Sequence, residues 1–461
     1  MTIAAVREAW KYRQAQFLAI LHGLDAWASI HHTGILWTLG ILYKFVLDAL
    51  YIWAASPQYA YAGLVYQPDS IKYIAAAVMY GLLFAALPKA EHSISTLLLH
   101  LQFALTVAPL LSFYALSDGS SRYILMVFCS VLLQTWVVRR PVSGVKPVHI
   151  RGIRNYVTVA LGVLTIFSLL IPIIYNGFAG LDSFNFSYIY IMRENATYPP
   201  GFSYVIGWMT NTILPFACVM FLHHKRYCLL AVCVFLQVLF YMETGYKFTL
   251  FILIPVIGIY FFSKTNHLLK CLYAGLIGLF FVILFTFRLD SPSGSGLGVI
   301  LNALLAIRAV FHPADNKFNF YEYFSDHPKI FFSDGLVGKM FSLTYPYAGS
   351  SGQVIFAAQG GEFLEANMNT GYLGESYAQM GFAGMLLMAA LLGVIVRGLE
   401  VYNSRERFCI LAGLFSTYFI ILNDGALFTT LFTGGMLLAF ALVFIYFGKQ
   451  QEAFGHGIQR L

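Results

Sequence analysis

Twelve long runs of apolar residues, separated by shorter polar segments, are the feature that most constrains how this chain can fold. A helix of about 20 apolar residues crosses the hydrocarbon core of a bilayer. Only 11% of the 461 residues are charged, whereas soluble domains carry about 25%. The pattern predicts an all-α, polytopic integral membrane protein with about 12 transmembrane helices and a single membrane domain, residues 1–461. The runs cover approximately residues 34–55, 73–88, 94–116, 123–138, 156–176, 203–222, 227–242, 247–263, 270–287, 372–396, 408–422 and 427–447.

The first of these runs contains two opposite charges, Lys44 and Asp48. Residues four apart lie one turn apart on the same face of a helix. A charge at membrane depth is costly unless it is paired. We therefore expect Lys44 and Asp48 to form an ion pair inside the first span.

The positions of the basic residues predict which side of the membrane each segment faces. Loops rich in Lys and Arg stay in the cytoplasm. With both termini placed in the cytoplasm, 18 of the 28 Lys and Arg residues fall in the cytoplasmic segments. The net charge of +7 does not indicate a nucleic-acid partner, because the basic residues lie between apolar runs and not along one face.

One long outside loop, residues 288–371, lies between the ninth and tenth spans. Loops longer than about 15 residues are uncommon unless they are functional. Its apolar segment 297–310 is too short to span, is followed by Pro313, and is expected to lie flat at the outer interface. An aromatic run follows, which is either an interfacial belt or a platform for sugar rings or a lipid tail. This run comprises Phe318, Phe320, Tyr321, Tyr323, Phe324, Phe331 and Phe332.

Four basic residues are expected at the outer face: Arg193, Lys247, Arg288 and Arg308. Guanidinium groups bind phosphate through two parallel hydrogen bonds. A converging set of such residues predicts a ligand that carries phosphate, and these residues would stabilise the charge of a departing pyrophosphate. The alternative is that the side chains reach toward lipid phosphate, above all Arg288 at the end of its span.

A carboxylate is the second expected component of the site. Glu375 lies where the long loop enters the tenth span, and a buried carboxylate there suits a general base toward a sugar hydroxyl. Its alternative role is a structural hydrogen bond to a neighbouring span. His312, Glu365 and Glu362 are other candidate bases outside the membrane. The sequence contains no clustered His, Cys and Asp residues with metal-ligand spacing, so no metal or other cofactor is expected.

Three segments resemble a known family. They are Gly245-Tyr246-Lys247 before an apolar run, Arg308 followed by the aromatic run, and the segment 369–384 with its Gly, Glu and Tyr residues. Together with the order of spans and the large loop before the last three, they resemble the bacterial oligosaccharide repeat-unit polymerases of the O-antigen polymerase (Wzy) type, which are related to the O-antigen ligases. The resemblance extends over the general layout of the chain.

The resemblance implies a metal-independent, GT-C-like glycosyltransferase of the bacterial inner membrane with its active site facing the periplasm. The enzyme would transfer a growing glycan from undecaprenyl pyrophosphate onto the next lipid-linked repeat unit. The resemblance also allows a chain-length regulator protein as a partner. Arg308 and Glu375 would be catalytic, and Arg193, Lys247 and Arg288 would join Arg308 at the pyrophosphate. The expected glycan-binding residues are Asn369, Tyr372, Tyr377, Tyr321 and Tyr323.

Two other functions remain open at this stage. An O-antigen ligase would use the same donor but a different acceptor, which the sequence does not identify. A flippase or transporter of lipid-linked glycans would also need many spans, but many transporters are built from internal repeats. We find no such repeat, and an outside loop of about 80 residues favours an enzyme over a transporter.

Overall fold

The computed structural model describes residues 32–140, 154–178, 180–290, 296–361 and 367–447. All the regular elements in these ranges are helices. The α-helices are α2 (His32–Leu50), α3 (Ser56–Tyr59), α4 (Ser70–Ala86), α5 (Ile94–Gln102), α6 (Ala108–Leu116), α7 (Ser121–Arg139), α8 (Arg154–Asn176), α9 (Phe186–Asn195), α10 (Phe202–Trp208), α11 (Leu214–His223), α12 (Tyr227–Thr244), α13 (Lys247–Phe251), α14 (Leu253–Phe262), α15 (Leu268–Leu289), α16 (Leu297–Leu301), α17 (His312–Asp326), α18 (Leu336–Phe341), α19 (Ser351–Ala358), α20 (Gly371–Leu399), α21 (Phe408–Ile421), α22 (Leu427–Leu431) and α23 (Met436–Phe447). The π-helical segments are η1 (Tyr51–Ala55), η3 (Phe103–Val107), η5 (Met209–Ile213) and η6 (Asn302–Phe311), and the 3₁₀ turns are η2 (Ala60–Ala62), η4 (Gly180–Phe184) and η7 (Glu400–Tyr402).

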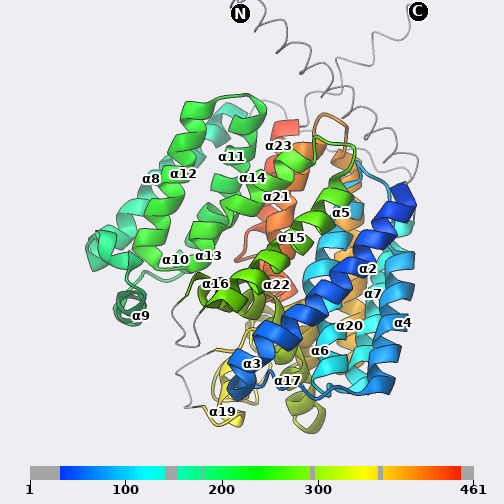
Figure 1. The fold of residues 1–461 in the computed structure, drawn as a ribbon. Helices are drawn as coiled ribbons and strands as arrows, with labels where there is room; N and C mark the ends of the chain where they lie inside the picture. Colours follow the sequence, from blue (N-terminus) through cyan, green and yellow to red (C-terminus); the bar gives the residue numbers. More distant parts are fainter. Residues whose placement is uncertain (1–31, 141–153, 179, 291–295, 362–366, 448–461) are drawn as a thin grey trace, which may run out of the picture.

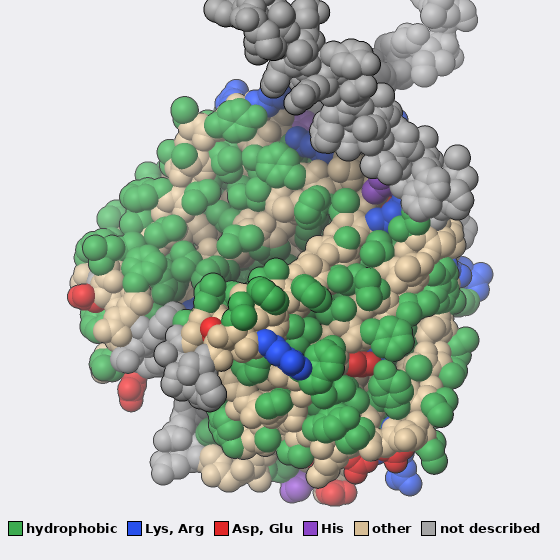
Figure 2. All heavy atoms as spheres, in the orientation of Figure 1, with side chains coloured by type: hydrophobic (Ala, Val, Ile, Leu, Met, Phe, Trp, Pro, Cys, Tyr) green, Lys and Arg blue, Asp and Glu red, His purple; other side chains and the backbone are tan. Residues whose placement is uncertain are grey.

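The helices agree with the apolar runs of the sequence, so the protein is an all-helical, multi-pass membrane protein. Each of the twelve predicted runs coincides with a helical segment to within a few residues. In the described ranges, ten helical stretches are long and apolar enough to cross a membrane, and three further apolar helices are shorter. Hydrophobic side chains cover most of the face shown in Figure 2, as expected for a surface in contact with lipid.

Burial separates the central spans from the peripheral ones. The span Ile94–Leu116, formed by α5, η3 and α6, is buried along nearly its whole length. The span Arg154–Asn176, helix α8, is more apolar but mostly exposed. An apolar helix that is buried on all sides belongs to the core, whereas one that exposes an apolar surface in such a protein faces lipid. The α5–α6 span is therefore the axis around which the other helices pack.

The ion pair predicted inside the first span is confirmed. Lys44 Nζ lies 2.5 and 2.6 Å from the two carboxylate oxygens of Asp48, and both side chains are buried. The same carboxylate accepts hydrogen bonds from Ser112 Oγ of α6 at 2.6 Å and from Tyr73 OH of α4 at 3.0 Å. Asp48 thus joins three helices, because each polar group buried among them needs a partner within the protein.

A second buried network joins the central span to α7 and α20. The side-chain amides of Gln102 and Gln134 donate to each other's oxygens at 2.9 and 2.7 Å. Tyr372 is completely buried, and its hydroxyl interacts with both amides, at 3.2 Å from Gln134 Oε1. Tyr372, which the sequence assigned to glycan binding, therefore lies in the packing core at the start of α20.

The two ends of the bundle are formed by different helices. Helix α2 begins and α23 ends at one end, which is uppermost in Figure 1, whereas α3, α9, α17 and α19 lie toward the opposite end. We call this opposite end the distal end. Helices α17 and α19, which the sequence predicts to lie outside the cytoplasm, are at the distal end and help to line the cavity described below.

The expectation that segment 297–310 is too short to span and is ended by Pro313 is wrong. Residues Leu297–Asp326 form one continuous helical stretch of 30 residues, made of α16, η6 and α17. Pro313 is tolerated because it occupies the first turn of α17, directly after the π-helical segment, where the hydrogen-bonding register changes. The stretch packs against α15, η1 and α20.

Helix α20 is kinked about a third of the way along its length, counted from Gly371. Met380 and Gly381 leave the helical conformation, and Gly381 has a φ of +63°, which favours glycine. The kink frees the carbonyls of Ala378 and Gln379, which accept hydrogen bonds from the N–H groups of Ile330 and Phe331, each at 3.0 Å. The loop after α17 is thereby attached to α20 alongside Glu375.

Removing one member of the buried ion pair should destabilise the protein more than removing both. We expect Asp48→Ala to lower the free energy of unfolding by roughly 3–5 kcal/mol, because it leaves the Lys44 ammonium buried without its partner. The double variant Lys44→Met/Asp48→Leu should lower the free energy of unfolding by less, since neither buried charge remains. Unfolding in mixed detergent micelles, followed by circular dichroism, measures both. A single variant as stable as the unmodified protein would contradict a stabilising role for the pair.

Candidate functional site

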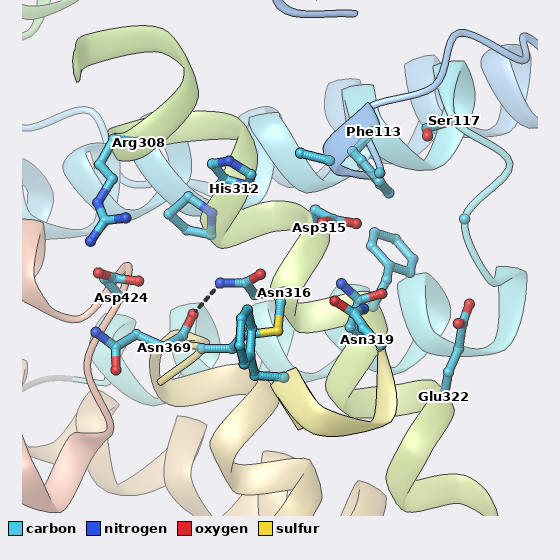
Figure 3. Close-up of a pocket in the computed structure, with 18 of the residues that line it drawn as sticks. Phe113, Ser117, Arg308, His312, Asp315, Asn316, Asn319, Glu322, Asn369 and Asp424 are labelled. Carbon is cyan, nitrogen blue, oxygen red and sulfur yellow. Dashed lines mark hydrogen bonds between the residues drawn. The ribbon is translucent and has the colours of Figure 1, made fainter. Parts of the chain in front are cut away.

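A cavity of about 740 Å³ opens at the distal end (Figure 3). Its walls come from segments far apart in the sequence, namely the turn after α3, the end of α6, the η6–α17 stretch, the segment after α19 and the turn between α21 and α22. The cavity volume is typical of a site for a small or medium-sized organic ligand. The lining residues are Tyr61, Ala62, Gly63, Phe113, Ser117, Asp118, Gly119, Arg308, His312, Pro313, Asp315, Asn316, Phe318, Asn319, Glu322, Phe356, Gln359, Gly361, Asn367, Met368, Asn369 and Asp424.

One helical face supplies the main polar wall. Its five polar residues follow one another at intervals of four, three, four and three, which places them on one side of a helix. The face begins in η6 and continues through α17 across Pro313, so it exists only because the helix does not stop at that proline. These residues are Arg308, His312, Asp315, Asn319 and Glu322.

A cation and a carboxylate face each other at one end of the cavity. The Arg308 guanidinium and the Asp424 carboxylate point toward one another in Figure 3, with Asn369 beside them. Burial raises the pKa of Asp424 above its usual range, whereas the positive charges of Lys317 and Arg308 act to lower it. The main chain nearby is held by Asn316, whose Nδ2 donates to the carbonyl of Asn369 at 2.7 Å.

The turn that carries Asp424 is held by its neighbour Asn423. Lys317 is fully buried and donates from Nζ to the Asn423 carbonyl at 2.6 Å and to the Pro313 carbonyl at 2.8 Å. Asn423 Nδ2 donates to the carbonyl of Ala309 at 2.8 Å, and its Oδ1 accepts from Thr106 at 3.0 Å. Helices from three parts of the chain thus set the position of Asp424 relative to Arg308.

Asp315 is a buried carboxylate on the same wall. Asp315 is only 7% exposed. In the described part of the chain it takes part in no ion pair. Gly63, with a φ of +93°, faces it so closely that an added Cβ would lie 3.3 Å from Asp315 Oδ2. A buried carboxylate without a cation is costly, which marks Asp315 as a functional candidate.

Three of the predicted site residues line this cavity: Arg308, His312 and Asn369. The aromatic run contributes Phe318, but Tyr321, Tyr323 and Tyr377 are not among the lining residues.

The three tyrosines instead pack against other side chains. The Tyr321 ring lies 5.1 Å from Tyr123 and 4.9 Å from Tyr377, measured between centroids. Tyr323 stacks on His327 at 3.9 Å. The rings that do face the cavity are those of Tyr61, Phe113, Phe318 and Phe356.

The other predicted basic residues do not line this cavity. The guanidinium of Arg193, on α9, lies 4.8 Å from the centre of the Tyr246 ring, next to Lys247 at the start of α13. The guanidinium of Arg288 lies 5.4 Å from the centre of the Trp53 ring. The four predicted cations are therefore not gathered around one cavity, because they extend from separate helices.

Glu375 also lies apart from the cavity lining. Its carboxylate accepts hydrogen bonds from Gln379 Nε2 at 2.9 Å and from Ser351 Oγ at 3.3 Å. These contacts attach the start of α19 to α20 and are those of the structural alternative considered for this residue. Glu365 and Glu362, the outer alternative carboxylates, lie outside the described residues.

Several polar residues of the cavity were not predicted from the sequence, above all Asp315, Asn319, Glu322 and Asp424. The alternation of four- and three-residue intervals from 308 to 322 was the available signal, but the segment was expected to end at Pro313. Asp424 lies in an Asn-Asp-Gly turn between two apolar runs, and such a turn has an ordinary structural explanation.

Comparison of the chain with protein-family models, with characterised proteins and with solved structures finds no match. The described residues also contain no group of three or more His, Cys, Asp and Glu side chains placed to hold a metal ion.

The proximity of Arg308 to Asp424 can be tested through the protonation of Asp424. A positive charge favours the ionised carboxylate, so Arg308→Gln should raise the pKa of Asp424 still further. The infrared band of the protonated carboxyl should then persist to higher pH than in the unmodified protein. Asp424→Asn, which lacks that band, identifies the signal. An unchanged titration in Arg308→Gln would show that the two groups do not interact.

Proposed function

We propose that this protein is a membrane glycosyltransferase that transfers a glycan from a polyprenyl-pyrophosphate donor to a hydroxyl of a second lipid-linked oligosaccharide. The single observation that carries this proposal is the distal cavity, which combines one arginine with several carboxylates, amides and aromatic rings. The function deduced from the family resemblance requires a site of this composition at the membrane surface.

The polar wall of the cavity suits a sugar. Carboxylates accept hydrogen bonds from hydroxyl groups, and side-chain amides both donate and accept them. Five side-chain amides line the cavity, and aromatic rings offer apolar surfaces for the C–H faces of a sugar. The amide residues are Asn316, Asn319, Gln359, Asn367 and Asn369.

Arg308 suits the pyrophosphate. Its planar guanidinium can hold two phosphate oxygens and can stabilise the negative charge that develops as the pyrophosphate leaves. Asp424 opposite it would repel a phosphate if it were ionised. Burial favours the neutral acid of Asp424, which reduces this repulsion when the donor binds.

The position of the cavity suits a lipid-linked donor. A polyprenyl chain remains in the bilayer, so its pyrophosphate and sugars are presented at the membrane surface. The cavity lies at the distal end of the bundle, beside the long η6–α17 helical stretch whose first part is apolar. In the proposed orientation this end faces the periplasm.

Arg308→Ala should reduce glycan transfer by roughly 10²–10³-fold in turnover, the typical cost of removing one group that stabilises developing negative charge. The measurement is the length and amount of polymer formed from a defined polyprenyl-linked repeat unit by the purified protein in vesicles. Arg122→Ala is the matched control, because Arg122 is an exposed arginine at the start of α7 outside the cavity. Long polymer of normal abundance from Arg308→Ala would remove this residue from the mechanism.

The same assay separates the polymerase from its two alternatives. A ligase would join the glycan to a different acceptor and would not extend the lipid-linked repeat unit. A flippase would move the labelled lipid across the vesicle bilayer without forming any new glycosidic bond.

A further inference from the structure

We infer that Asp315 is the general base of this site and accepts the proton of the acceptor hydroxyl. The inference rests on the proposed function and assigns one reaction step within it. It is drawn from the position of Asp315 in the cavity wall, the absence of a cation paired with it among the described residues, and an unsatisfied acceptor on the next residue.

The carboxylate of Asp315 is both buried and turned toward the cavity. It lies in the middle of the polar helical face, between the end that holds Arg308 and the end that holds Glu322 (Figure 3). The nearest ammonium along the helix, Lys317, points elsewhere and donates to the carbonyls of Pro313 and Asn423. Asp315 is therefore not neutralised by the only buried lysine of its own helix, and a hydroxyl that enters the cavity can become its partner.

The residue next to Asp315 carries a buried acceptor atom that lacks a partner among the described residues. Asn316 uses its Nδ2 to hold the Asn369 carbonyl at 2.7 Å. Its Oδ1 is buried and has no hydrogen-bond partner among the described residues. Buried acceptors are almost always satisfied in proteins, so an exception that lines a cavity indicates a place for a ligand donor.

The other titratable groups of the cavity are less suitable as the base. His312 packs its ring against Tyr59, with the centroids 6.2 Å apart, and is one helical turn from the positive charge of Arg308. Asp424 faces Arg308. Glu322 is exposed, and Asp118 pairs with Lys72.

The distance between Asp315 and Arg308 allows the two residues to contact different groups, the acceptor hydroxyl and the pyrophosphate. Seven residues along a helix correspond to two turns, or about 10 Å along its axis. A pyrophosphate held by Arg308 and an acceptor hydroxyl held by Asp315 would then lie on either side of the donor sugar. This is the arrangement that a displacement at the sugar C1 requires, because the attacking and leaving oxygens must be separated.

In the proposed step the acceptor hydroxyl gives its proton to the Asp315 carboxylate while its oxygen forms a bond to C1 of the donor sugar. The bond between C1 and the pyrophosphate oxygen breaks, and its electron pair stays on the pyrophosphate, whose charge Arg308 stabilises. Protonated Asp315 afterwards releases the proton to water. This transfer step needs no oxidant, reductant or metal ion.

The test compares Asp315→Asn and Asp315→Ala with Asp326→Asn in the vesicle assay. Asp326 is exposed at the end of the same helix and does not line the cavity. We expect Asp315→Asn to lower kcat by at least about 100-fold, with the Kd of the polyprenyl-pyrophosphate donor unchanged, and Asp326→Asn to keep normal kcat. Added formate should restore turnover of Asp315→Ala in proportion to its concentration, because the small carboxylate can occupy the vacated space and take the proton.

Three outcomes would overturn the assignment. Asp315→Asn with normal kcat would exclude Asp315 as the base, and loss of activity in Glu375→Gln with normal activity in Asp315→Asn would return that role to Glu375. An Asp315→Ala variant that is folded, binds the donor and is not restored by formate would show that Asp315 has a structural role. None of these results affects the proposed function, which fails instead if the unmodified protein forms no glycosidic bond from the lipid-linked repeat unit.

Discussion

The requirement that polar groups at membrane depth find partners within the protein governs the arrangement of this bundle. In the apolar interior an unsatisfied polar group costs several kcal/mol, on the order of the stability of a whole domain. The carboxylate of Asp48 meets this requirement by joining α2, α4 and α6. The amides of Gln102 and Gln134 do the same for the central span and α7. These contacts determine which helices are neighbours, which apolar contacts alone specify weakly.

The same requirement applies to the polar groups that line the distal cavity. The walls of the distal cavity carry a guanidinium, carboxylates and amides from segments that are hundreds of residues apart in the sequence. Asn423 brings these segments together, because it bonds to Thr106, Ala309 and Lys317 at once. The helix packing thus supports the site directly, and the proposed glycan donor and acceptor would find hydrogen-bond partners on these walls.

The sequence predicted the helices far better than the site. Apolar runs mark helices reliably, because length and composition act locally, and the Lys44–Asp48 pair was predictable because it lies within one helix. The prediction that the segment ends at Pro313 was wrong, since a proline is tolerated where a π-helical segment meets an α-helix. Glu375 and Arg193 were singled out for their chemical type, but which cavity a side chain lines depends on packing partners that a single sequence does not reveal.

By itself, then, the sequence determined that this is an all-helical, multi-pass membrane protein, where nearly every apolar helix begins and ends, and that one long segment lies between the last three apolar runs and the rest. Only the tertiary structure decided that Arg308 and Asp424 face each other and that Asp315 lies buried beside a cavity. The reason is physical. Hydrophobicity is a property of each segment and can be read along the chain, whereas the surroundings of a charged side chain are made by residues that only folding brings together.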